Sequence, residues 1–145
     1  MTILIEIVCS VSQEEPVQAT IEAICKETGD LLIGRRVNKE THEVLLVVQL
    51  LQTVNVSRHT TALSHALQQG VIASFRYVSS DLVKISFDPS LDLQEQMRDF
   101  PLRPDESWFP AIDDAQQAYV CLRRPLMSAN QAAWLLKHEV SWVYV

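Results

Sequence analysis

The sequence predicts an α+β fold with a mixed, mainly antiparallel sheet on which helices pack. Runs of β-branched and apolar residues of the length of a strand recur along the chain. Within the first 78 residues, two segments whose apolar residues recur at helical spacing lie between these runs. The chain has 145 residues, of which 48% are hydrophobic, and this is the size and composition of one globular domain, residues 1–145. The first 78 residues are ordered β-α-β-β-α-β. This is the ferredoxin-like order, and a C-terminal strand-helix-strand extends it.

The first strand and the first helix are predicted from β-branched residues and from capping signals. Residues 2–8 alternate as a strand. Ser12 and Glu15 have the spacing of a capping box, and Gly29 supplies a left-handed stop. Between these signals, apolar residues recur at helical spacing, at Val17, Ile21, Ile24 and Cys25.

A hairpin is predicted next. Residues 31–37 and 43–51 are expected to be strands, because the polar segment 38–42 between them has the composition of a turn. Residues 44–48 are apolar on both faces of the second strand. We therefore expect a central strand that is covered on both sides, by further layers or by a dimer partner.

A second helix and two more strands complete the first six elements. Ser57 is expected to cap a helix that ends at Gln69, with Gly70 as its stop. Residues 71–78 and 82–87 are predicted to be separate strands, because a short polar turn stands between them.

The last third of the chain is predicted to extend the sheet. Ser128 and Gln131 have a second capping-box spacing. No internal repeat of 20 to 50 residues is visible by motif. The expected elements are a short helix from Pro89 and Ser90 to Phe100, an ordered loop over 101–110, a strand over 117–122, a helix from Ser128 to His138 and a strand over 140–145.

Charge and hydropathy exclude several classes of partner. The net charge of −6 argues against binding to a nucleic acid backbone, which depends on clustered Lys and Arg. The longest apolar run, 44–51, is far shorter than the roughly 20 residues that span a bilayer. The N-terminus has no basic region of the kind that a signal peptide requires. We therefore expect a cytoplasmic protein that contacts neither membrane nor nucleic acid.

The familiar catalytic and cofactor motifs are absent. No Walker loop, dinucleotide fingerprint, GxSxG elbow or HExxH helix occurs in the sequence. We therefore expect a protein that is not an enzyme, with no catalytic residue, no cofactor and no metal. Surface or helix-end positions are expected for the four histidines, His42, His59, His65 and His138.

The cysteines leave one enzymatic alternative open. Their number is odd and their contexts are apolar, so we expect buried free thiols at Cys9, Cys25 and Cys121. Cys121 lies two residues before Arg123, and a cationic neighbour can activate a thiol. An enzyme of unrecognised type that uses Cys121 or the carboxylates is the weakest of the hypotheses.

The most unusual feature is an acidic segment, residues 88–114. It holds eight acids and two arginines, and this local charge equals the net charge of the chain. Aromatic side chains anchor protein interfaces, and charges steer the partner. The interpretation favoured here is an interface for a basic protein partner, formed by Asp105, Glu106, Trp108, Phe109, Asp113 and Asp114. The alternative is that Trp108 and Phe109 close one end of the sheet while the acids form a solvated rim.

Two resemblances suggest functions. The acidic, aromatic-containing surface resembles that of bacterial immunity proteins and phage-encoded inhibitors, which implies a non-enzymatic inhibitor of a toxin or nuclease-like partner. The element order of the first 78 residues resembles that of ferredoxin-like regulatory modules such as the ACT domain, which bind amino acids at helix–strand junctions. Those modules place a glycine in the first strand–helix turn, whereas this chain has Ser10-Val11-Ser12-Gln13-Glu14, so no ligand residue is transferred. This second resemblance implies a small-molecule-binding or regulatory module that acts as a homodimer.

Overall fold

The computed structural model describes residues 2–145, and it confirms the predicted α+β class. The chain divides into two compact units, an N-terminal unit (Thr2–Ser79) and a C-terminal unit (Ser80–Val145). The N-terminal unit contains β1 (Thr2–Ser10), the 3₁₀ helix η1 (Val11–Gln13), α1 (Glu14–Thr28), β2 (Leu31–Asn38), β3 (Glu43–Leu50), η2 (Thr53–Asn55), α2 (Val56–Gln68) and the first part of β4 (Ser74–Ser86).

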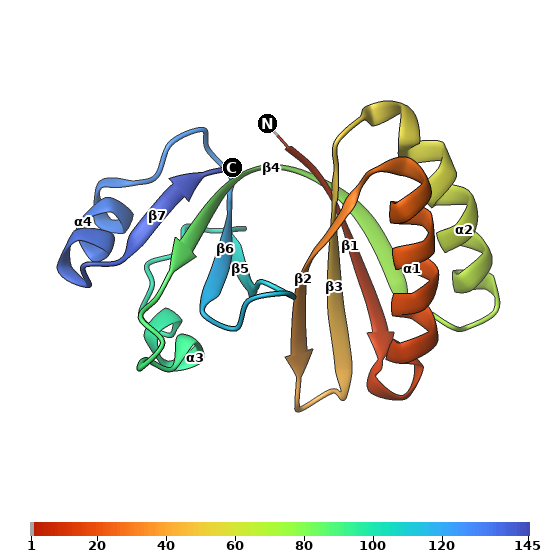
Figure 1. The fold of residues 1–145 in the computed structure, drawn as a ribbon, viewed down its shortest axis with the longest axis horizontal. Coiled ribbons are helices and arrows are strands. Elements are labelled where there is room, and N and C mark those ends of the chain that lie inside the picture. Colours follow the sequence, from red (N-terminus) through yellow and green to blue (C-terminus); the bar gives the residue numbers. More distant parts are fainter. Residues whose placement is uncertain (1) are drawn as a thin grey trace. The chain divides into compact units, whose positions relative to one another are not determined.

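The N-terminal unit has the predicted ferredoxin-like topology. Its strands are ordered β2-β3-β1-β4, and β3 pairs antiparallel with both β1 and β2. Helices α1 and α2 lie on the same side of this sheet (Figure 1). The core forms on that side, because alternate strand residues such as Ile5, Ile7 and Leu46 pack with Ile21 of α1 and Leu63 of α2. Val47, on the opposite face of β3, is also fully buried, as expected for a central strand apolar on both faces.

The C-terminal unit repeats this topology. It contains the second part of β4, α3 (Leu93–Met97), β5 (Ser107–Pro110), β6 (Gln117–Leu122), α4 (Ala129–Lys137) and β7 (Ser141–Tyr144). Its strands are ordered β5-β6-β4-β7, which is again second, third, first and fourth, and the pairs are antiparallel. The predicted strand-helix-strand extension is therefore part of a second β-α-β-β-α-β unit, which shares β4 with the first.

The shared strand corrects one prediction. Residues 71–78 and 82–87 do not form two strands, because β4 runs without a turn from Ser74 to Ser86. Of the polar residues that suggested a turn, Ser80 forms its hydrogen bonds within the sheet. Ser80 is buried, and its hydroxyl donates to the carbonyl oxygens of Leu122 and Asp81, each at 3.0 Å.

Some of the predicted helix caps are confirmed by the structure, and others are wrong. Gly29 adopts φ 81°, as predicted for a left-handed C-cap, and it ends α1. The capping box at Ser128 and Gln131 is confirmed in both directions, at 3.1 and 2.9 Å. Ser57 caps nothing, because α2 already begins at Val56.

The first predicted capping box is also wrong. Ser12 lies within the 3₁₀ turn, and its hydroxyl contacts the hydroxyl of Ser10 at 3.0 Å. Helix α1 therefore begins later, at Glu14, with no side-chain cap. The carboxylate of Glu14 instead binds the guanidinium of Arg35 on β2, which ties the first turn of the helix to the sheet.

The segment predicted as an irregular loop, 101–110, ends in a strand. Its last four residues form β5, in which Trp108 pairs with Val120 and Phe109 with Tyr119. Strand β5 is an edge strand of its unit, so Pro110 is tolerated at its end. None of the helices formed by residues 2–145 is long and apolar enough to cross a membrane.

Candidate functional site

A charged hollow of about 340 Å³ lies on the sheet of the N-terminal unit. Ile5 and Ile7 of β1 point into the core beneath the helices, so the alternate residues Glu6 and Val8 point to the opposite face. The hollow opens on that face. The residues that give it its character are Glu6, Val8, Arg36, Glu43, Leu45 and Arg76.

Opposite charges and an apolar floor characterise this hollow. Arg76 on β4 points its Nε and Nη2 atoms at Oε1 of Glu6, each at 2.8 Å. The side chain of Arg76 is 70% exposed and that of Glu6 16%. Val8 and Leu45 are paired in register between β1 and β3 and form an apolar floor.

A second pair of charges lines the hollow from the strands on its other side. Arg36 of β2 is in register with Leu45 of β3, and Glu43 stands two residues before Leu45. Glu43 is half-buried, in register with Asn38. Two guanidinium groups and two carboxylates therefore surround the apolar floor, and their formal charges balance.

The equivalent face of the C-terminal unit carries a different set of side chains. Lys84 lies between the core residues Val83 and Ile85, as Glu6 lies between Ile5 and Ile7. Its partner on the fourth strand is Val143, in the position that corresponds to Arg76. The ammonium of Lys84 lies 5.9 Å from the centre of the Tyr119 ring. Since the topology is the same, the charges of the hollow are not a requirement of the fold.

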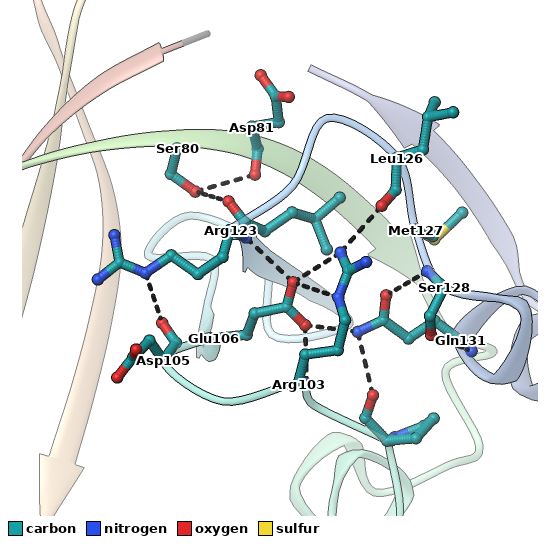
Figure 2. Close-up of polar contacts among 12 residues, drawn as sticks. Ser80, Asp81, Arg103, Asp105, Glu106, Arg123, Leu126, Met127, Ser128 and Gln131 are labelled. Carbon is teal, nitrogen blue, oxygen red and sulfur yellow. Dashed lines mark hydrogen bonds and ion pairs between the residues drawn. The ribbon is translucent and has the colours of Figure 1, made fainter.

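A buried polar network occupies the junction before β5 (Figure 2). Glu106 is 8% exposed, and its Oε1 accepts from the backbone N–H of Arg103 at 2.8 Å and from Nε2 of Gln131 at 2.7 Å. Its Oε2 accepts from Nε of Arg103 at 2.9 Å and from the backbone N–H of Arg123 at 3.0 Å. Arg103 and Gln131 also bind backbone carbonyls, so the network ties the 101–106 segment to β6 and α4.

The network keeps Glu106 ionised. Burial by itself raises the pKa of Glu106, but the hydrogen bonds from Arg103, Arg123 and Gln131 outweigh burial and lower the pKa to about 2. A carboxylate held in this way stabilises its own unit and cannot reach a partner without breaking the network. Glu106, one of the acids expected to bind a basic partner, is thus buried and bound within this network.

A similar network stands before β2 in the N-terminal unit. Asp30 is buried, and its Oδ1 accepts from the backbone N–H of Leu51 at 2.9 Å. Its Oδ2 accepts from the Thr28 hydroxyl at 2.9 Å and contacts Nε2 of His59 at 2.7 Å. Burial raises the pKa of Asp30, but the hydrogen bonds from Leu51, His59 and Thr28 prevail and lower it. His59, expected at the surface or at a helix end, is buried in the first turn of α2.

The six residues expected to bind a partner are not gathered on one exposed surface. Phe109 is 2% exposed and stacks on Tyr119 with ring centres 5.4 Å apart, and Trp108 is half-buried against the core. Asp105 and Asp113 are exposed, and Asp114 is half-buried with its Oδ1 accepting from the backbone N–H of Gln116. Phe109 and Glu106 are thus both buried, and neither is presented to solvent.

The cysteines and possible metal ligands give no further site. Cys9 and Cys25 are buried and free, and burial raises the pKa of each thiol, for Cys25 to about 11. Cys121 is half-buried. Within residues 2–145, no group of three or more His, Cys, Asp or Glu side chains is arranged to hold a metal ion.

Sequence reasoning did not find the hollow. Its signal is the placement of charged residues at alternate positions of otherwise apolar strands, as Glu6 stands between Ile5 and Ile7. Once the inward face of the strand is known, a charge at such a position is expected to point away from the helix-covered core. The four charges come from four different strands, so only the sheet order brings them together.

Comparisons with known proteins found similar solved structures. No family model and no curated protein matches the sequence. One similar solved structure is described as a "putative glycine cleavage system transcriptional repressor", with 14% identity, a TM-score of 0.42 and coverage of 99% of this chain and 96% of that chain. Another is protein BT0572 from Bacteroides thetaiotaomicron, with 10% identity, a TM-score of 0.41 and coverage of 99% and 93%. A third, described as a "putative monooxygenase" from Lactobacillus acidophilus, has 10% identity, a TM-score of 0.33 and coverage of 100% and 94%. All three TM-scores are below 0.5, so these similarities assign no function to this chain.

Proposed function

We propose that this protein is a non-enzymatic regulatory module that binds a small molecule and acts as a homodimer. The observation that carries the proposal is the charged hollow on the N-terminal unit. The hollow is concave, it combines an apolar floor with a few polar groups, and these are general features of small-molecule sites. The equivalent face of the C-terminal unit has Lys84 and Val143 where the hollow has Glu6 and Arg76, so the ion pair of the hollow is not repeated there, which favours a role in binding over a role in folding.

The dimer is supported by the edge of the C-terminal sheet. Strand β7 pairs with β4, and it is the edge strand of its unit. Trp142, Val143, Tyr144 and Val145 are all exposed, between 39% and 56%. An exposed apolar edge strand favours pairing with another chain. The partner that we propose is a second copy of this chain.

The inhibitor interpretation has less support. It required Phe109 and Glu106 to be presented to a basic partner, and both side chains are buried. Asp105 and Asp113 remain exposed acids, but isolated exposed acids are common on any protein surface.

The experiment that tests the proposal is a thermal unfolding screen of the purified protein against amino acids, short peptides, carboxylic acids and nucleotides at millimolar concentration. A ligand that binds only the folded state raises the midpoint of unfolding. We expect at least one class to raise it, and we expect light scattering to give the mass of a dimer. A protein that no class stabilises and that scatters as a monomer would refute the proposal.

A further inference from the structure

We infer that the hollow of the N-terminal unit binds a short peptide through its two charged ends. This inference rests on the proposed small-molecule function and names the site and the ligand class. The ligand would be a di- or tripeptide with free termini and an apolar middle.

The charges of the hollow form two poles. Glu6 and Arg76 form one pole, on β1 and β4. Arg36 and Glu43 line the hollow from β2 and β3 and form the other. Each pole offers a guanidinium, which binds a carboxylate, and a carboxylate, which binds an ammonium group. A peptide with free termini can therefore place its carboxylate at one pole and its ammonium group at the other, in either orientation.

The apolar floor lies between the poles. Val8 and Leu45 face each other across the β1–β3 pair, and both are half-buried. Neither offers a hydrogen bond to a ligand from its side chain. An apolar residue in the middle of the ligand would bury its own surface here, which favours binding.

The separation of the poles sets the length of the ligand. Arg36 and Arg76 lie on the outer strands of the β2-β3-β1-β4 order, three strand steps apart. At about 4.8 Å per step, their backbones are about 14 Å apart, and the Arg76 side chain extends inward as far as Glu6 on the neighbouring strand. Two or three extended residues span about 7–10 Å. A single amino acid is too short to contact both poles.

The ion pair at the first pole leaves room for exchange. Arg76 is largely exposed, and exposed ion pairs contribute little to stability. A ligand carboxylate can therefore share the Arg76 guanidinium with Glu6 at small cost. Glu6 is much less exposed, so its carboxylate is held in place as the acceptor for an ammonium group or for Arg76.

The test is isothermal titration calorimetry with the full chain and the tripeptide Ala-Leu-Ala. The comparison ligands are free leucine and the same tripeptide acetylated at its N-terminus and amidated at its C-terminus. We expect the free tripeptide to bind and each comparison ligand to bind at least about tenfold more weakly, because each loses contact with at least one pole.

Variants locate the site. Arg36→Gln and Arg76→Gln remove one guanidinium at each pole, and each is expected to weaken tripeptide binding about tenfold or more. Lys84→Gln is the matched control, because Lys84 occupies the corresponding face of the C-terminal unit, and it should leave binding unchanged. Arg76→Lys retains the charge and should recover part of the affinity, which separates a lost contact from a disturbed fold.

Two results would overturn the inference. One is tripeptide binding that Arg36→Gln and Arg76→Gln leave unchanged. The other is an absence of tripeptide binding while another class in the thermal screen stabilises the protein, which would leave the proposed function intact. If no class stabilises the protein, the protein scatters as a monomer and the tripeptide does not bind, both proposals fail together.

Discussion

Asp30 and Glu106 occupy the same position in the two units of the chain. Each lies directly before the second strand of its unit and accepts a hydrogen bond from the backbone N–H directly after the third strand, that of Leu51 or Arg123. Each is also bound by a side chain from the second helix, His59 or Gln131. A buried carboxylate thus joins the same three elements in both units.

A second correspondence lies in the last strands. Phe75 and Tyr77 on β4 form an edge-to-face pair at 6.3 Å, and Trp142 and Tyr144 on β7 form another at 5.5 Å. The Tyr77 hydroxyl donates to the carbonyl of Val56 at the start of α2. The Tyr144 hydroxyl accepts from the backbone N–H of Met127, just before α4. Each tyrosine therefore ties its strand to the start of the second helix.

The first prediction concerns the two carboxylates. Asp30→Asn and Glu106→Gln each place an amide donor against buried donors, so each should lower the free energy of unfolding by about 2–4 kcal/mol. Asp113→Asn is the control, because Asp113 is exposed, and it should change stability by less than about 0.5 kcal/mol. Urea unfolding followed by far-ultraviolet circular dichroism, which reports on both units, measures all three. Wild-type stability in Asp30→Asn and Glu106→Gln would show that the networks are not structural.

The second prediction is a loss of stability in acid. The pKa of Glu106 is about 2 in the folded protein, below the ordinary value of 4.5 that applies when the chain is unfolded. The stabilisation is therefore complete above about pH 4.5 and is lost as the pH falls toward about 2. Urea midpoints measured across this range should fall less steeply in Glu106→Gln than in the wild type. Parallel curves would contradict the role given to this carboxylate.

The third prediction compares Ser128, which caps α4 in the structure, with Ser57, which was predicted to cap a helix and does not. Ser128→Ala removes an observed capping box and should cost about 1 kcal/mol. Ser57→Ala alters a serine that makes no capping bond, and its effect should stay within about 0.5 kcal/mol. Thermal unfolding of the two variants under the same conditions makes the comparison. Equal losses would mean that Ser57 caps α2 in solution.

The fourth prediction concerns the dimer. Val143 is 56% exposed on β7, so Val143→Lys should keep the fold while placing a charge at the strand edge, with some loss of stability because Val143 is in register with Lys84. Leu136→Lys on α4 is the control, because Leu136 is 78% exposed and lies away from the edge strand. We expect light scattering to give monomers for Val143→Lys and dimers for Leu136→Lys. Dimers of both would place the interface elsewhere.

The local pattern of the sequence predicted most of the elements. Strand 117–122, the Gly29 stop and the Ser128 capping box depend on residues close together in the chain, and all are confirmed. The same local reasoning failed at β4. There, Ser80 suggested a turn because its partner, the carbonyl of Leu122, lies 42 residues away.

The burial of Glu106 was harder to predict for the same reason. Glu106 looked like a surface acid because one of its partners, Gln131, follows 25 residues later.

One signal of the second unit was present in the sequence. A serine, two aromatic residues and a valine stand at the same positions in two five-residue segments, Ser74-Phe75-Arg76-Tyr77-Val78 and Ser141-Trp142-Val143-Tyr144-Val145. A similarity of five residues does not by itself indicate a repeat. It does so here because the strand order shows that each segment forms the fourth strand of a unit.

Amide hydrogen exchange with and without Ala-Leu-Ala tests the central claim most directly, because it reports on both units of one chain in one experiment. We expect the tripeptide to slow exchange on the strands that line the hollow, around Glu6, Arg36, Leu45 and Arg76, and to leave β5, β6 and β7 unchanged. Slowed exchange confined to the C-terminal unit, or no change in either unit, would contradict the claim that the N-terminal unit carries the ligand site.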